Sequence, residues 1–186
     1  MSDKTALIEE LLDNPPKGAW KREEYDKLVI GATMRSPAAF FLIPFMAVWS
    51  GMSIGGIYGS QIVNKEFNLF LSLFGIPFLA GTVIMLSMTL LAIAGKVEVV
   101  IGHESYVFKG VGKIGIKKRF DWNSVIRIYE SDHNIGNDVS VDSRYSSSRY
   151  SSIFIEGKER IIFGGGLKEN RKYFLLTALK YYHSRK

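Results

Sequence analysis

Hydrophobic and polar positions divide the chain into three stretches with different periodicities. The middle stretch contains two runs without a charged residue, 36–64 and 67–95, and only Lys65 and Glu66 separate them. A hydrocarbon core about 30 Å thick is crossed by about 20 apolar helical residues, and both runs exceed that length. We therefore predict a transmembrane helical hairpin over residues 36–95, with a tight turn between the two helices.

Glycines are unusually frequent in the first of these runs. Gly51, Gly55 and Gly59 recur at every fourth position, although each glycine weakens a helix in water by roughly 1 kcal/mol relative to alanine. Between lipid-embedded helices, small residues permit the close backbone packing that drives association. We expect this glycine stripe to pack against another helix. The second helix of the same hairpin is the preferred partner, because the hairpin must pack its own helices first, and a second copy in a homo-oligomer is the alternative.

The N-terminal stretch, residues 1–35, mixes charged and apolar positions. Leucine and isoleucine recur at helical spacing over residues 7–12, and Asn14-Pro15-Pro16 ends that pattern. Residues 19–34 are predicted to form a second short helix. These amphipathic helices are expected to lie along the membrane or on the C-terminal half, and soluble lead-in helices are the open alternative.

The pattern changes to a period of two after Gly95, which indicates β-strands. Six short alternating segments lie within 96–130 and 151–164, and the polar segment 131–150 between them is predicted to be a flexible loop. A terminal amphipathic helix follows Gly164-Gly165-Gly166. Its predicted inward face consists of Leu167, Phe174, Leu175, Ala178 and Tyr182.

Three phrases of the C-terminal half resemble a known family: "VEVVIGHESYVFKG", "RFDWNSVIRIYES" and "IFIEGKERIIFGGGLKENRKYFLLTAL". In their strand–turn pattern and final helix, residues 96–184 look like the bacterial pleckstrin-homology-like (PH-like) domains that follow one or two membrane helices. The resemblance implies a bent β-barrel capped by a C-terminal helix, with a scaffold or interaction role. That fold has seven strands, so the seventh is expected within 138–150. The expected fold class is a membrane α-helical hairpin plus an α+β domain at 96–186.

Charge is unevenly distributed along the chain. Residues 1–95 carry 7 basic and 8 acidic residues, whereas 96–186 carry 17 basic and 10 acidic residues, for a net charge of +6. Basic residues flank both ends of the predicted hairpin, while its turn has only Lys65. The positive-inside rule then predicts a multi-pass inner-membrane protein with both termini, and the domain at 96–186, in the cytoplasm.

A cluster of basic residues in one predicted β-hairpin is the candidate binding site. Lys113 and Lys117 are predicted to share one strand face, with Ile114 and Ile116 pointing inward. Contact with anionic phospholipid headgroups contributes about 1 kcal/mol per basic residue near the surface. The alternatives are a protein partner and a solvated face without a ligand. Nucleic acid is not expected, because membrane tethering disfavours it. The cluster comprises Lys109, Lys113, Lys117, Lys118 and Arg119.

Motifs for catalysis are missing from the sequence. It contains no cysteine, no histidine pair at metal-ligand spacing, no nucleophile elbow and no phosphate-binding loop. We therefore expect no metal, no cofactor and no enzymatic activity. The expected function is a non-enzymatic, membrane-anchored scaffold or sensing module that binds a protein partner or an anionic lipid surface. The alternative is a subunit of a small oligomeric transporter or pore, lined by Ser50, Ser53, Ser60 and Gln61.

Overall fold

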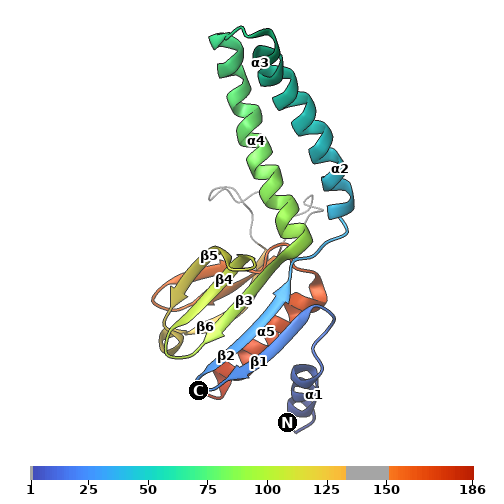
Figure 1. Cartoon of the computed structure of the whole chain (residues 1–186). Helices are drawn as coiled ribbons and strands as arrows, with labels where there is room; N and C mark the ends of the chain where they lie inside the picture. The colour runs from blue at the N-terminus through green and yellow to red at the C-terminus, as the bar shows by residue number, and fades with distance from the viewer. Residues whose placement is uncertain (1, 133–150) are drawn as a thin grey trace, which may run out of the picture. The chain divides into compact units, whose positions relative to one another are not determined.

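A computed structural model describes residues 2–132 and 151–186 of the chain (Figure 1). The described residues form two compact units. One unit combines the N-terminal segment, up to Met34, with the segment that begins at Lys96, and the other is Arg35–Gly95. The helical unit is thus inserted into the sequence of a single domain, and both ends of the chain belong to that domain.

The helical unit consists of two long apolar helices, as the sequence predicts. Each covers 26 residues, Ala39–Asn64 and Leu69–Ala94, and each is long and apolar enough to cross a membrane. The turn between them contains Lys65 in a left-handed conformation (φ 53°), and the Asn68 side chain caps the second helix by accepting a hydrogen bond from the Leu71 amide. Along the chain the elements are α2 (Ala39–Ser50), the π-helix η1 (Gly51–Gly59), α3 (Ser60–Asn64) and α4 (Leu69–Ala94).

Tyr58 and Gly75 make a close contact between the two helices of this hairpin. The Tyr58 hydroxyl donates a hydrogen bond of 2.9 Å to the carbonyl of Ser72, and a Cβ built on Gly75 would lie only 2.4 Å from the Tyr58 oxygen. By contrast, a Cβ on Gly51, Gly55 or Gly59 would meet no atom within 4 Å. The predicted packing of the glycine stripe against the second helix is therefore wrong for this hairpin, and packing against a second copy stays a prediction.

We expect Gly75→Leu to destabilise the hairpin, because the new side chain must displace Tyr58 and break its hydrogen bond to Ser72. Gly55→Leu is the matched control, since its side chain enters open space. Thermal unfolding in mild detergent should be lowered only by the first change. Equal losses from both would contradict this contact, and a loss confined to Gly55→Leu would indicate packing of the stripe against a second chain.

The N-terminal segment contributes one helix and two strands. The predicted first helix is present as α1 (Ser2–Asp13), but the predicted second helix is replaced by a β-hairpin of β1 (Ala19–Glu24) and β2 (Lys27–Thr33). Ile30 and Ala32 share one face of β2 and are fully buried. β2 pairs antiparallel with the strand that follows α4, from Leu28↔Ile101 to Thr33↔Lys96. Strand pairing across the inserted helices therefore decides this segment's conformation.

The strands form two antiparallel sheets. The order is β1-β2-β3-β4-β5 in one sheet and β6-β7-β8 in the other, and within the described ranges no strand pairing joins the two. All six strands predicted after Gly95 are present, and two additional strands, β1 and β2, come from the N-terminal segment. The predicted seventh strand at 138–150 lies outside the described residues. Their bounds are β3 (Gly95–Ile101), β4 (Ser105–Val111), β5 (Ile114–Phe120), β6 (Arg127–Asp132), β7 (Ser151–Glu156) and β8 (Arg160–Phe163). Of the predicted loop 131–150, Ser131 and Asp132 end β6, Ser151 begins β7, and the rest is outside the described residues.

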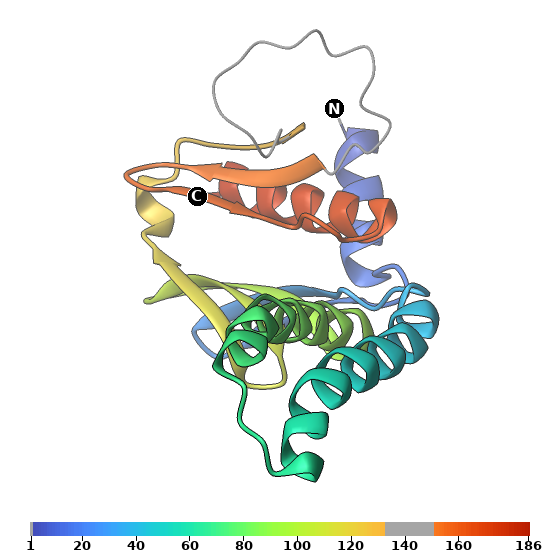
Figure 2. The ribbon, with the colours of Figure 1, turned by 90° about the horizontal axis from the view of Figure 1, so that it is seen from above.

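The C-terminal helix α5 (Glu169–Ser184) completes the core of the domain. It packs on β1 and β2 of one sheet, on β6 of the other and on α1 (Figure 2). Phe174, Leu175 and Ala178 of the predicted inward face are fully buried, and so is Leu179, which the prediction did not include. Arg171 ties this helix to the N-terminal segment, because its guanidinium donates hydrogen bonds to the carbonyls of Lys17 (3.0 Å) and Thr33 (2.9 Å).

Candidate functional site

The basic cluster lies on the hairpin formed by β4 and β5, which is predicted from the sequence and present in the structure. Val111 pairs with Ile114 across a two-residue turn of Gly112 and Lys113. Gly112, the first central residue of the turn, has a φ of +60°. Tight hairpin turns need a positive φ at this position, and glycine adopts it without strain. Gly110 and Gly115 face each other, and a Cβ on either would collide with the opposite backbone.

The basic side chains are distributed over both faces of this hairpin. Lys109 and Lys118 occupy the face that carries buried Val107, because Val107 pairs with Lys118 and Lys109 pairs with Ile116. Lys117 lies on the other face, where its ammonium sits 3.6 Å from the centre of the Tyr106 ring. Lys113 belongs to the turn. The cluster is therefore spread along the hairpin, from Lys113 in the turn to Arg119 near the opposite end of β5, instead of forming a single basic face.

Ile114 and Ile116 do not point into the core, which corrects the prediction made from alternation. They are 85% and 66% exposed. β5 is the last strand of the five-stranded sheet, and its end near the turn extends beyond the packed interior. Only the other end of the hairpin, at Val107 and Phe120, packs with the core. Alternation identifies the face correctly, but the face is uncovered at this position.

Most of these cations have no acidic partner. Arg119 makes one exposed ion pair with Glu104 at 3.9 Å, a type of contact that contributes little to stability. Within the described ranges, no carboxylate pairs with Lys109, Lys113 or Lys118. Charged residues on an edge strand also oppose edge-to-edge aggregation, which is the structural alternative to a binding role.

The turn of the β4–β5 hairpin lies at the sheet end where the chain leaves for the helices and returns. β2 ends at Thr33, and its partner Lys96 stands one residue into β3. β4 runs back along β3 after a short turn, so that Val111 returns to the end where β3 begins. The Lys96 ammonium lies 5.6 Å from the centre of the Phe108 ring, which agrees with this arrangement.

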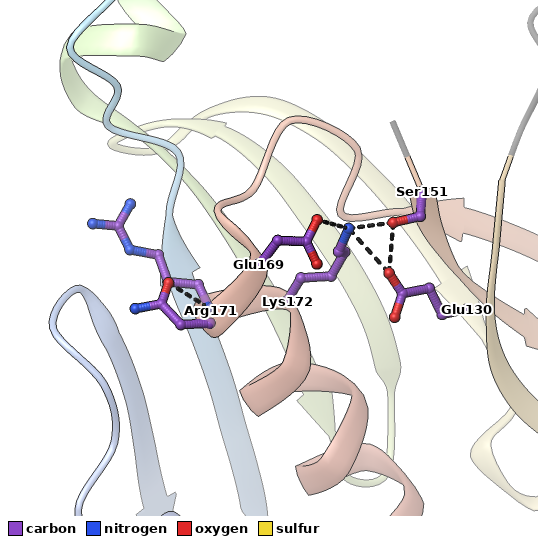
Figure 3. Close-up of polar contacts among 6 residues, drawn as sticks. Glu130, Ser151, Glu169, Arg171 and Lys172 are labelled. Atoms are coloured by element: carbon purple, nitrogen blue, oxygen red, sulfur yellow. Dashed lines mark hydrogen bonds and ion pairs between the residues drawn. The ribbon is translucent and has the colours of Figure 1, made fainter. Parts of the chain in front are cut away.

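A buried polar cluster, shown in Figure 3, joins α5 to the other sheet. Lys172 as a whole is only 2% exposed, and its ammonium forms ion pairs with Glu169 at 2.9 Å and Glu130 at 3.0 Å. Lys172 also donates a hydrogen bond to the Ser151 hydroxyl, which donates to Glu130 at 2.5 Å. No signal in the sequence reveals this cluster, because its members come from three elements and only Glu169 and Lys172 show helical i,i+3 spacing.

The charges in this cluster stabilise one another. The hydrogen bond from Ser151, followed by those from Lys172, lowers the pKa of Glu130 against the opposing effect of burial. Burial alone would lower the pKa of Lys172, but its hydrogen bonds to Glu169 and Glu130 outweigh that effect and raise it. Lys172 is therefore held as a cation, which is unsuited to accepting a proton from Ser151. The arrangement is a structural tie between α5, β6 and β7.

One cavity and His183 are further candidates for a chemical site among the described residues. A cavity of about 600 Å³ opens beside the β3–β4 turn, and its lining mixes both charges, with Arg119 and Lys158 beside Glu104 and Asp121. His183 contacts the Val125 carbonyl through Nε2 at 2.9 Å and packs edge-on against Trp122, which are core contacts. Among the residues that the structure describes, no group of three or more acidic or histidine side chains is placed to hold a metal ion.

Comparisons with known proteins do not assign the chain to a family. No family model, no curated protein and no solved structure matches it. The PH-like resemblance therefore stays a prediction that rests on the sequence phrases alone.

Proposed function

We propose that this protein is a non-enzymatic, membrane-anchored module whose β4–β5 hairpin contacts the anionic lipid surface of the membrane that holds its helices. The observation that carries this proposal is the insertion of two uncharged 26-residue helices between neighbouring strands of one sheet. The basic hairpin turn lies at that same end of the sheet. A PH-like scaffold or sensing role, in the inner membrane with the domain in the cytoplasm, is part of this proposal.

The covalent connections limit how far the domain can move from the bilayer. β3 begins at Gly95, directly after the last residue of α4, Ala94. Met34 and Lys96 therefore remain within a few residues of the apolar helices, at roughly 3.3 Å per extended residue. A screening length of about 8 Å at physiological salt lets ammonium groups at this end of the sheet interact with lipid phosphates.

The charge of the folded domain also supports an anionic lipid surface as the partner. The folded domain contains 22 basic and 17 acidic residues, because the acidic N-terminal segment belongs to it as well. This modest excess makes the local arrangement more important than the total. Among the described residues, three lysines of the hairpin have no carboxylate partner, and each contributes about 1 kcal/mol near an anionic surface. Lys113 lies in the turn, Lys109 lies near it, and Lys118 lies further along β5 on the face of Ile114 and Ile116.

The proposal predicts that these lysines are shielded by anionic lipid. In the full-length chain in nanodiscs, a water-soluble amine-acylating reagent should modify Lys113 and Lys118 more slowly with phosphatidylglycerol than with phosphatidylcholine. High salt should reduce the difference, because the contact is electrostatic. Lys158 is an exposed control beside the cavity at the other end of the strands, and its reactivity should not depend on the lipid. Equal reactivity of Lys113 and Lys118 in both lipids at low salt would contradict the proposal and favour a protein partner.

A further inference from the structure

The exposed isoleucines at the tip of the β4–β5 hairpin are not explained by electrostatic contact alone. Ile114 and Ile116 lie on one face of β5 beside Val111, which pairs with Ile114 across the turn. Single exposed apolar side chains are common on protein surfaces. Here, however, two β-branched residues at 85% and 66% exposure stand next to each other on a protruding strand end, in a hairpin that the core does not cover.

The charges around these isoleucines form a border. Lys109 is the cross-strand partner of Ile116, Lys113 precedes Ile114 in the turn, and Lys118 follows on the same face. A lysine side chain can lie along an apolar surface through its methylene groups while its ammonium reaches a polar layer. An apolar tip ringed by such cations matches the boundary between acyl chains and anionic headgroups, where amphipathic elements bury their apolar side by about 5–10 Å.

We infer that the β4–β5 hairpin inserts Ile114 and Ile116 into the headgroup–acyl boundary of an anionic bilayer, with Lys109, Lys113 and Lys118 among the lipid phosphates. This inference rests on the proposed function and adds a mode of binding to it. The occupant is the bilayer and not a second protein chain, for two reasons. The cations need an anionic partner, and β3 begins directly after the last residue of α4, so the covalent connection between them is short.

The chain has no cysteine, so a single introduced cysteine can carry a fluorescent probe. Ile114→Cys, labelled with bimane in the full-length chain, should be quenched by nanodisc lipids that carry a nitroxide near the glycerol backbone. We expect at least about twofold stronger quenching than for labelled His103→Cys, which is exposed in the β3–β4 turn at the other end of β4, because insertion places the probe at the nitroxide depth. Equal quenching at the two sites would overturn the insertion.

Amine acylation gives a second test that does not alter the tip with a probe. Apolar insertion is not screened by salt, so part of the protection of Lys113 and Lys118 should survive high salt in the wild-type chain. The double variant Ile114→Ser/Ile116→Ser should lose that salt-resistant part, and both positions are exposed, so the fold is kept. Protection that vanishes completely at high salt in the wild type would overturn insertion while leaving the electrostatic contact in place. Absence of protection at any salt would overturn both.

Discussion

Removing residues 34–95 and joining Thr33 to Lys96 by a short turn should produce a soluble, cooperatively folding domain. Thr33 and Lys96 are antiparallel neighbours, so their Cα atoms lie about 4.5–5.5 Å apart and a two-residue Asn-Gly connection can join them. The fusion retains the strands, the two packed helices and the hydrogen bonds from Arg171 to Lys17 and Thr33. A single cooperative thermal transition and dispersed amide resonances are the expected result.

The matched control is the fragment that begins at Lys96, which is the domain boundary suggested by hydropathy alone. It lacks α1, β1 and β2, and therefore exposes the edge of β3 and removes buried Ile30, Ala32 and Leu12 from the core. At about 2–5 kcal/mol for each large buried side chain, the loss of Ile30 and Leu12 is comparable with the roughly 5–15 kcal/mol that stabilises an ordinary domain. The unpaired edge of β3 adds to this loss. We expect this fragment to aggregate or to show no cooperative transition. A stable, soluble fragment would contradict the interleaved domain.

Replacing Lys172 by methionine should cost the domain about 3 kcal/mol. The change leaves Glu130 without its ion pair at a partly buried position and removes the tie between α5 and the β6–β7 pair. Removing one partner of a buried ion pair typically costs about 3–5 kcal/mol, and the low end applies because Glu169 is well exposed. Lys180→Met, at an exposed position of the same helix, is the control and should change stability little. Chemical denaturation of the full-length chain in mild detergent measures both variants.

The pH dependence of stability provides a check on the same cluster. The folded-state pKa of Glu130 is lowered, so its contribution is present above the pKa of the unfolded carboxyl and is lost as the pH falls through the folded value. The folded-state pKa of Lys172 is raised, so its contribution is present at neutral pH and is lost only in strongly alkaline solution. Glu130→Gln should therefore flatten the loss of stability in acid. An unchanged acid limb would show that the cluster does not contribute.

The proposed lipid contact and the edge-strand interpretation of the same lysines differ in which positions must be charged and in whether lipid composition matters. Protection against edge pairing requires only that charges stand along β5, and it predicts no dependence on lipid composition. Lipid contact requires the cations in the turn or on the strand face that carries the isoleucines. Lys117 and Arg119 are on the opposite face of β5 and already contact Tyr106 and Glu104. The lipid dependence of Lys113 and Lys118 therefore separates the two interpretations.

Features that depend on local composition follow from the sequence by itself. The two apolar helices follow from the length of the uncharged runs, because each run is a local property of consecutive residues and depends on no contact with the rest of the chain. The strands after Gly95 and the inward face of α5 follow from periods of 2 and 3.6, because each of these elements has one buried face. Both the candidate hairpin and its cations are found in this way.

Only the tertiary structure decides how segments distant in the chain are used. Residues 19–33 carry charges and apolar residues in an order compatible with either a helix or a hairpin, and pairing of β2 with β3 selects the hairpin. Ile114 and Ile116 alternate like core residues, but the edge position of β5 leaves them exposed. The glycine stripe faces open space because Tyr58 on Gly75 makes the close contact instead. Lys172 is buried because Glu130 and Ser151 reach it from other strands, and burial of a charge depends on partners that sequence spacing does not reveal.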